Sequence, residues 1–218
     1  LTHYLEVAAD RYPHKAAIVY GGRSLSYGQL RARVSALSAF LSQRMGVQPG
    51  DRVLLMSQNC PQFIEAFYAV MRSGAVVVPV NAMSTAEEVA YYMQNSGAHV
   101  ALVAQELLPH VLPNMQPHSA DGLTAVMVHA YSDALPAEHI DPDLPDVVLA
   151  PRLPLTQAGL HGMEDAIAQQ LVQTLNHPDV NDLCVLPYTS GTTGHPKGCK
   201  HTHATVLASN MSSQTWRS

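Results

Sequence analysis

The chain has few charged residues and no block of basic ones. Lys and Arg number 12 and Asp and Glu 17, so 13% of the 218 residues are charged and the formal net charge is −5. Because nucleic acids are bound through clustered Lys and Arg, this distribution argues against a nucleic-acid-binding surface. A hydrophobic content of 47% indicates a globular protein rather than a disordered one.

Long apolar runs and a secretion signal are also absent. No run approaches the roughly 20 apolar residues of a transmembrane segment, and the N-terminus has no signal-peptide pattern. The three cysteines, Cys60, Cys184 and Cys199, are odd in number and include no Cys-x-x-Cys pair. Such cysteines fit a reduced thiol state better than a disulfide framework, so we expect a cytoplasmic protein.

Three familiar ligand-binding motifs are missing. The dinucleotide fingerprint Gly-x-Gly-x-x-Gly does not occur, and neither does the zinc motif His-Glu-x-x-His. The 12 histidines are mostly scattered through polar or Pro-rich segments, so we expect no dedicated metal site. A Walker A loop is excluded because Pro196 separates His195 from Lys197, and Gly198 follows where Ser or Thr is required.

What the sequence does contain is a loop, 188–198, that is rich in glycine and hydroxyl residues. It reads Tyr-Thr-Ser-Gly-Thr-Thr-Gly-His-Pro-Lys-Gly. Glycine lets backbone amides approach a ligand, Ser and Thr add hydroxyl donors, and Lys adds a compact positive charge. Together they predict a cradle for the phosphates of a nucleotide. A flexible surface linker is the alternative, but a linker gives no reason for the buried-strand pattern of 183–186 just before it.

The loop resembles, nearly letter for letter, the phosphate-binding signature of the adenylate-forming enzymes. That family comprises acyl-CoA synthetases, the adenylation domains of peptide synthetases, and luciferases. Two more segments resemble the family: Ser-Leu-Ser-Tyr-Gly-Gln-Leu at 24–30 and Gly-Ala-Val-Val-Val-Pro-Val-Asn at 74–81. The resemblance therefore extends over most of the chain.

The resemblance implies which residues bind ATP. The loop would hold the β- and γ-phosphates, and Lys197 would steer and partly neutralise them; a merely solvated Lys197 is the alternative. Thr202 and His203 match the family's Thr-His pair, either as ligand contacts or as the start of the next helix. The nucleotide-binding residues so implied are Thr189, Ser190, Gly191, Thr192, Thr193, Gly194 and Lys197.

The resemblance also implies a two-step reaction. A small-molecule carboxylic acid attacks Mg²⁺-bound ATP to give an acyl-adenylate and pyrophosphate, and coenzyme A then displaces AMP. The family's remaining motifs, including the catalytic lysine of its C-terminal domain, have no counterpart before Ser218. We therefore expect an N-terminal fragment that is inactive as a ligase by itself.

Strand and helix patterns alternate along the chain with short connections. This predicts an α/β fold with a mostly parallel sheet flanked by helices. The resemblance implies that this fold is the N-terminal part of the family's large domain. Capping boxes are expected at Ser26/Gln29 and at Ser84/Glu87. Strands are predicted at 16–20 and, after a hairpin at Gly21-Gly22, at 23–25. Further strands are predicted at 52–56, 75–80, 100–103, 123–128, 183–186 and 199–201. Helices are predicted at 1–12, 26–46, 61–74, 84–95, 163–176 and from 203 to the end.

Two regions stand apart from this regular pattern. Because its sequence is rich in proline, the segment 109–160 is predicted to be an irregular surface segment, and no function is assigned to it. We divide the chain into an α/β subdomain, 1–180, and a segment, 181–218, with the phosphate loop and the start of the next subdomain.

Three functional readings remain from the sequence. The first is an acyl-CoA ligase acting on a fatty acid, favoured because the loop reads Ser-Gly-Thr-Thr-Gly and because Thr202 precedes His203. The second is an amino-acid adenylation domain of a peptide synthetase, whose loops usually read Ser-Gly-Ser-Thr-Gly and whose sequel is usually Glu-His. The third is a stand-alone, non-catalytic nucleotide- or phosphate-binding module.

Overall fold

A mostly parallel β-sheet forms the centre of the molecule. The computed structural model describes residues 1–218 except 120–121, 139, 173–177, 190–194 and 216–218. Within the described residues seven strands form one sheet in the order β11-β8-β4-β3-β5-β6-β7, and only β11 pairs in the antiparallel sense. The predicted α/β class is confirmed. The strands are β3 (Arg52–Met56), β4 (Val76–Val80), β5 (Val100–Ala104), β6 (Ala125–His129), β7 (Leu160–Gly162), β8 (Leu183–Val185) and β11 (His201–Thr202).

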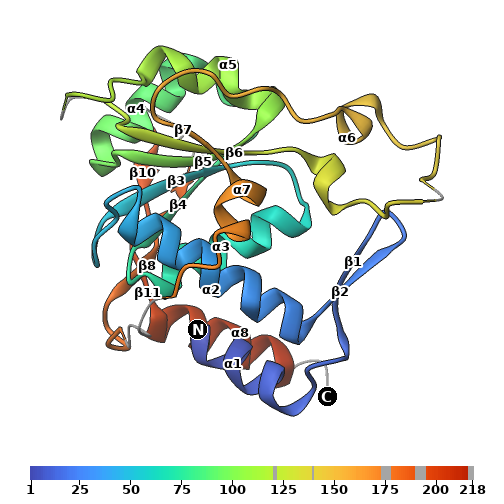
Figure 1. The fold of residues 1–218 in the computed structure, drawn as a ribbon. Coiled ribbons are helices and arrows are strands. Elements are labelled where there is room, and N and C mark those ends of the chain that lie inside the picture. Colours follow the sequence, from blue (N-terminus) through green and yellow to red (C-terminus); the bar gives the residue numbers. More distant parts are fainter. Residues whose placement is uncertain (120–121, 139, 173–177, 190–194, 216–218) are drawn as a thin grey trace.

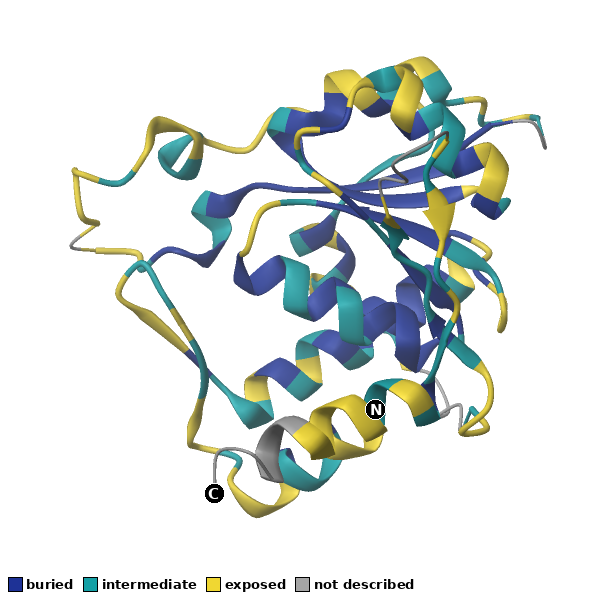
Figure 2. Ribbon diagram, turned by 180° about the vertical axis from the view of Figure 1, so that it is seen from behind, coloured by how far each residue is buried: buried dark blue, intermediate teal, exposed yellow. Residues whose placement is uncertain are grey.

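Helices cover both faces of this sheet, which explains why its central strands are apolar at nearly every position. One face packs against α2 (Tyr27–Gln43), α3 (Pro61–Arg72) and α7 (Met163–Ala168), with α1 (Thr2–Arg11) outside them (Figure 1). The other face packs against α4 (Ala86–Ser96) and α5 (Leu108–Val111). Successive side chains alternate between the two cores: Leu55 lies in the first and Leu54 in the second. Figure 2 shows the resulting band of buried strands.

The N-terminal hairpin and the helix after it form as predicted. Strands β1 (Ala16–Tyr20) and β2 (Arg23–Ser26) pair antiparallel around Gly21 and Gly22, whose φ values of 52° and 85° favour glycine. Ser26 then caps α2: its Oγ accepts from the Gln29 amide at 3.3 Å, and the Gln29 side chain accepts from the Ser26 amide at 2.8 Å. The predicted capping box is therefore confirmed.

The start of α4 differs from the prediction by one residue. Thr85 is the N-cap, accepting from the Glu88 amide at 3.3 Å, and the Glu88 carboxylate accepts from the Thr85 amide at 2.8 Å. The predicted pair Ser84 and Glu87 was wrong. The Ser84 amide donates to the Asn81 carbonyl at 2.9 Å, closing a turn that delays the helix by one residue.

The segment 109–160 is more ordered than predicted. It contains the buried strand β6, which begins two residues later than expected, and it leads into the edge strand β7, which extends the parallel sheet. Between them lie the short helices η3 (Tyr131–Ala134) and α6 (Asp146–Leu149), and η1 (Gln105–Leu107) and η2 (Leu112–Asn114) flank α5. β7 was missed because its three residues, Leu-His-Gly, carry no strand periodicity.

The helix predicted at 163–176 is much shorter. α7 ends at Ala168, and Gln170 adopts a φ of 47°, which is incompatible with a continuing α-helix. Ile167 and Leu171 still pack against the first core. Leu175, which the predicted helix also included, lies outside the described residues.

The last part of the chain forms short strands and a helix. The strand predicted at 183–186 forms as β8, and the short strands β9 (Tyr188–Thr189) and β10 (Lys197–Gly198) follow it. β11 takes the place of the strand expected at 199–201. Thr202 accepts from the Thr205 amide at 3.2 Å and so caps α8 (His203–Thr215), as predicted. None of the helices in the described ranges is long and apolar enough to cross a lipid bilayer.

Candidate functional site

The predicted phosphate loop begins where a parallel strand ends. β8 lies parallel to β4, with Val185 opposite Val77, and the Leu186 amide donates to the Val77 carbonyl at 2.8 Å. The chain then enters the hairpin β9–β10, whose base is closed by the Cys199 amide donating to the Pro187 carbonyl at 2.8 Å. In open α/β sheets, ligands bind outside the carboxyl ends of the strands, which is where this hairpin lies.

Two of the predicted ligand residues occupy matching positions on this hairpin. Thr189 is paired directly with Lys197, and both are exposed. Because directly opposite residues of an antiparallel pair lie on the same face, the hydroxyl and the ammonium group can act on one ligand. The remaining predicted residues, Ser190, Gly191, Thr192, Thr193 and Gly194, lie outside the described residues, between these two ends.

The entering arm of the hairpin is attached to α4. The Tyr188 hydroxyl donates to Oδ1 of Asn95 at 2.7 Å, and its ring lies 4.8 Å from the ring of Tyr92. Burial, and secondarily the neighbouring tyrosines, raise the pKa of Tyr188, so this hydroxyl remains a hydrogen-bond donor. The arm is therefore fixed by both a polar and an aromatic contact.

The leaving arm is attached to the same helix. Tyr91 donates its hydroxyl to the Pro196 carbonyl at 2.7 Å and stacks on His195 with ring centroids 5.2 Å apart and planes 19° from parallel. The sequence analysis did not identify these α4 residues. The available signal was the pair Tyr91-Tyr92, since two adjacent aromatic residues cannot both belong to one apolar helical stripe.

Gly198 allows the hairpin stem to pack closely. A Cβ placed there would lie 3.2 Å from Cδ1 of Leu186 and 3.3 Å from Cζ of Tyr188. Each of these distances is shorter than ordinary van der Waals contact. A larger residue would therefore push Leu186 or Tyr188 aside and disturb the hairpin next to Lys197.

The Thr-His pair follows the hairpin, and Thr202 and His203 lie at the start of α8. The Thr202 hydroxyl is used in capping α8. His203 is buried, burial lowers its pKa, and its Nδ1 has no hydrogen-bond partner among the described residues. Of the Thr-His pair, Thr202 therefore has a confirmed capping role.

The fold is an open, mostly parallel α/β sheet, and the hairpin β9–β10 lies at its carboxyl edge. The sequence model of the family "AMP-binding enzyme" matches residues 5–218, so the chain belongs to the AMP-binding enzyme family.

Named relatives include several CoA ligases. Over 230 residues the chain is 30% identical to the long-chain-fatty-acid–CoA ligase of Bacillus subtilis (strain 168), covering 99% of this chain and 39% of that protein. A feruloyl-CoA synthase from an Amycolatopsis species is 31% identical over 194 residues, which cover 89% of this chain and 31% of that protein. The chain thus spans well under half of the length of these relatives.

A solved structure supports the same fold. The fatty acyl CoA synthetase of Mycobacterium tuberculosis superposes with a TM-score of 0.68 at 25% identity, over 97% of this chain and 36% of that one. The sheet order and the helices of the present chain therefore belong to a known architecture of CoA ligases.

Proposed function

We propose that the whole protein is an AMP-forming acyl-CoA ligase that activates a fatty acid and transfers it to coenzyme A. The observation that supports this proposal is the hairpin β9–β10 at the carboxyl edge of the sheet, in a chain that belongs to the AMP-binding enzyme family. The name of the Bacillus relative supports the choice of a fatty acid.

The chemistry requires charge stabilisation at the phosphates. The acid's carboxylate attacks the α-phosphorus of ATP and breaks the bond to the bridging oxygen, giving acyl-adenylate and pyrophosphate. The thiol of coenzyme A then attacks the acyl carbon and releases AMP. Pyrophosphate accumulates negative charge as it leaves, and donors arranged beforehand lower the energy of that transition state.

In this proposal the hairpin end binds the β- and γ-phosphates. Thr189 supplies a hydroxyl donor and Lys197 a positive charge from the same face of the ribbon, and the intervening 190–194 supplies further hydroxyls and amides. Charge-assisted hydrogen bonds are each worth about 1.5–3 kcal/mol, so a few of them change the rate strongly.

Helix α4 would reduce the cost of ordering this loop. Tyr91 holds the leaving arm, while Asn95 and Tyr92 hold the entering arm. Fixing both arms before ATP arrives removes part of the entropy that binding must otherwise overcome. Tyr91 and Asn95 are thus positioning residues, because they act through the hairpin.

The Mg²⁺ ion enters as part of the Mg-ATP substrate. In the described part of the chain no three His, Cys, Asp or Glu side chains gather closely enough to hold a metal ion. We therefore assign this chain's residues to the phosphates alone.

The test is exchange of labelled pyrophosphate into ATP by the full-length protein, in the presence of a fatty acid, ferulate or a mixture of amino acids. Exchange with the fatty acid, followed by acyl-CoA formation, is the expected result. Exchange supported by ferulate alone would change the substrate class and keep the mechanism. Exchange supported by amino acids alone would instead identify a peptide-synthetase adenylation domain, and ATP binding without any exchange would identify a non-catalytic module.

A further inference from the structure

His195 lies in the leaving arm of the hairpin and is not among the residues assigned to ATP. It stands two residues before Lys197, at a bend in the chain. Its ring stacks on Tyr91 of α4, with centroids 5.2 Å apart and planes 19° from parallel, yet the residue remains exposed. A titratable ring is therefore held beside the place where the phosphates would bring their negative charge.

Three local constraints fix where this imidazole lies. The Tyr91 hydroxyl donates to the Pro196 carbonyl at 2.7 Å, which holds the arm against α4. The proline ring fixes the φ of Pro196 and restricts the backbone of His195 before it. The stack on Tyr91 covers a face of the imidazole and leaves its nitrogen-bearing edge open, and neither nitrogen has a hydrogen-bond partner among the described residues. That edge is therefore available to a ligand.

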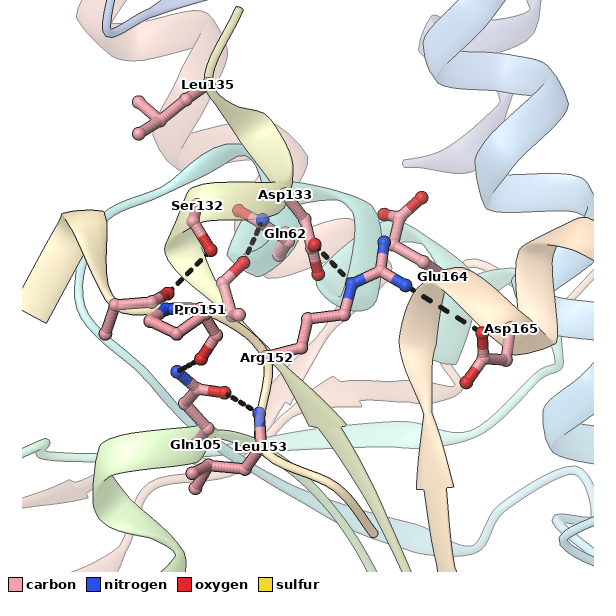
Figure 3. A network of polar contacts seen from close by, with 12 residues as sticks. Gln62, Gln105, Ser132, Asp133, Leu135, Pro151, Arg152, Leu153, Glu164 and Asp165 are labelled. Carbon is pink, nitrogen blue, oxygen red and sulfur yellow. Dashed lines mark hydrogen bonds and ion pairs between the residues drawn. The ribbon is translucent and has the colours of Figure 1, made fainter. Parts of the chain in front are cut away.

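The basic groups at this end of the hairpin lack anionic partners. In the part of the chain that the structure describes, neither Lys197 nor His195 forms an ion pair. The guanidinium of Arg152, near the ends of β6 and β7, is different: it pairs with Asp133 and lies 3.8 Å from Asp165 (Figure 3). Because their charge is not already offset by carboxylates, the groups on the hairpin can act on an incoming anion.

The titratable groups around the imidazole leave its proton to be decided by a ligand. On α4 the neutral ring of Tyr91 covers it, while Glu87 and Glu88, one turn earlier, bind the N-cap of that helix. In the entering arm, burial raises the pKa of Tyr188, so this side chain adds no negative charge. Lys197 is positive and opposes protonation of the ring, whereas the phosphates of a ligand would favour it.

We propose that His195 is a second cation for the phosphates of ATP, present only while its imidazole is protonated. A cation over the face of a tyrosine, within about 6 Å of the ring centroid, is attracted to that ring, so Tyr91 stabilises the charged form. Imidazole is the side chain whose charge changes near physiological pH, so His195 strengthens ATP binding as the pH falls. This inference rests on the proposed function, because it takes ATP to be the ligand of the hairpin.

The test compares the dissociation constants of Mg-ATP for the full-length wild type, His195→Gln and His195→Arg, measured by calorimetry. At about pH 6 the glutamine variant should bind about three- to tenfold more weakly than the wild type, the scale of one solvent-exposed charge, and at about pH 8 the two should be equal. His195→Arg has a permanent charge and should bind more tightly than the glutamine variant throughout. Since phosphate groups also take up a proton near pH 6, the proteins are compared with one another at the same pH.

A control variant and a spectroscopic measurement complete the test. His14→Gln removes an exposed histidine outside the hairpin and should match the wild type at every pH. The ring-proton resonances of His195 should titrate at a higher pH when ATP is bound, because the coupling between proton and ligand is reciprocal. A glutamine-to-wild-type ratio that does not change with pH, or a titration that ATP does not move, would overturn the proposal. A wild type that shows this pH dependence but no pyrophosphate exchange would support the role of His195 and contradict the proposed function.

Discussion

Lys197 and Thr189 illustrate how much single residues depend on their place in the fold. Each has a general chemistry that the sequence already reveals, a cation and a hydroxyl. Their direct pairing across the hairpin puts both groups on one face, where they can act on the same phosphate. Lys197 has no ion-pair partner among the residues that the structure describes, so its charge is available for a ligand.

The first prediction concerns this charge. Lys197→Ala in the full-length protein should lower the rate of acid-dependent pyrophosphate exchange by roughly 10²-fold, the scale for losing one transition-state donor. Lys200→Ala is the matched control, because Lys200 is exposed and lies just beyond the hairpin. Equal rates in the Lys197 variant and the wild type would remove Lys197 from the mechanism.

The second prediction concerns His129 and pH. Burial lowers the pKa of this imidazole from 6.5 to about 3. As the pH falls below 6.5, His129 is therefore protonated in the unfolded chain but stays neutral in the folded chain. His129 thus favours folding above pH 6.5, and that contribution is lost toward pH 3, with a slope of up to about 1.4 kcal/mol per pH unit.

Urea unfolding between pH 4 and 7, at pH values spaced by about one unit, measures this slope. His129→Gln should flatten the dependence of the unfolding free energy on pH. His14→Gln, which changes an exposed histidine, should leave the slope as in the wild type. An unchanged slope in the His129 variant would show that this imidazole is already accessible to protons in the folded state.

At the scale of elements, the main contact of the candidate site is the one between α4 and the hairpin. Tyr91 and Asn95 lie one turn apart on α4, and each holds a different arm through a hydrogen bond of 2.7 Å. A helix is a rigid support, and a hairpin of two-residue strands has little stability of its own. The helix therefore decides where the loop begins and ends.

The third prediction tests this support. Tyr91→Phe keeps the ring that stacks on His195 and removes the hydrogen bond to Pro196. A hydrogen bond contributes about 1 kcal/mol net, so we expect the KM for ATP in pyrophosphate exchange to rise up to about fivefold. Tyr92→Phe, which keeps the ring beside Tyr188, is the control. A lowered thermal stability with an unaltered KM would assign Tyr91 to folding alone.

The fourth prediction separates the two candidate caps of α4. Thr85→Ala should lower the free energy of unfolding by about 1 kcal/mol, because the Glu88 amide loses its acceptor. Ser84→Ala should have a smaller effect, since in the described structure the Ser84 side chain is not the cap. Denaturant unfolding of both variants measures the difference, and a larger loss in the Ser84 variant would contradict the observed helix start.

At the scale of the whole molecule, Arg33 connects three helices. It lies on α2 and binds Glu65 of α3 in a bidentate way, at 2.6 and 3.0 Å, and also binds Glu164 of α7. Glu65 is 2% exposed, and its burial raises its pKa against the opposing effect of Arg33. Removal of the guanidinium would leave a buried carboxylate without compensation.

The fifth prediction follows from this contact. Arg33→Met should lower the unfolding free energy by about 3–5 kcal/mol, and adding Glu65→Leu should restore much of it, since apolar replacements often substitute for a buried pair. Arg31→Met, which breaks an exposed pair with Asp10, should cost at most about 1 kcal/mol. Equal losses in the single and double variants would show that Glu65 is not the reason for the cost.

How much was predictable differs from one feature to another. The apolar runs of β3, β4 and β5 and the capping box at Ser26 were predictable because each signal is local and strong. The predicted Ser84 cap was wrong because a turn closed by the carbonyl of Asn81 delays the start of the helix. The predicted long helix after Met163 was wrong because Gln170 adopts a positive φ, which ends the helix. Of the candidate site, the loop and Lys197 were predicted from sequence and stay a prediction, whereas Tyr91 and Asn95 were not predicted.

The sequence alone determined that the chain is an α/β protein of this family and where its glycine- and hydroxyl-rich loop lies, because these properties depend on residues adjacent in the chain. Tertiary structure decided that α4 holds both arms of the hairpin and that Arg33 joins three helices. Such contacts join residues as many as 131 positions apart. They depend on how the sheet is ordered in space, which local patterns do not encode.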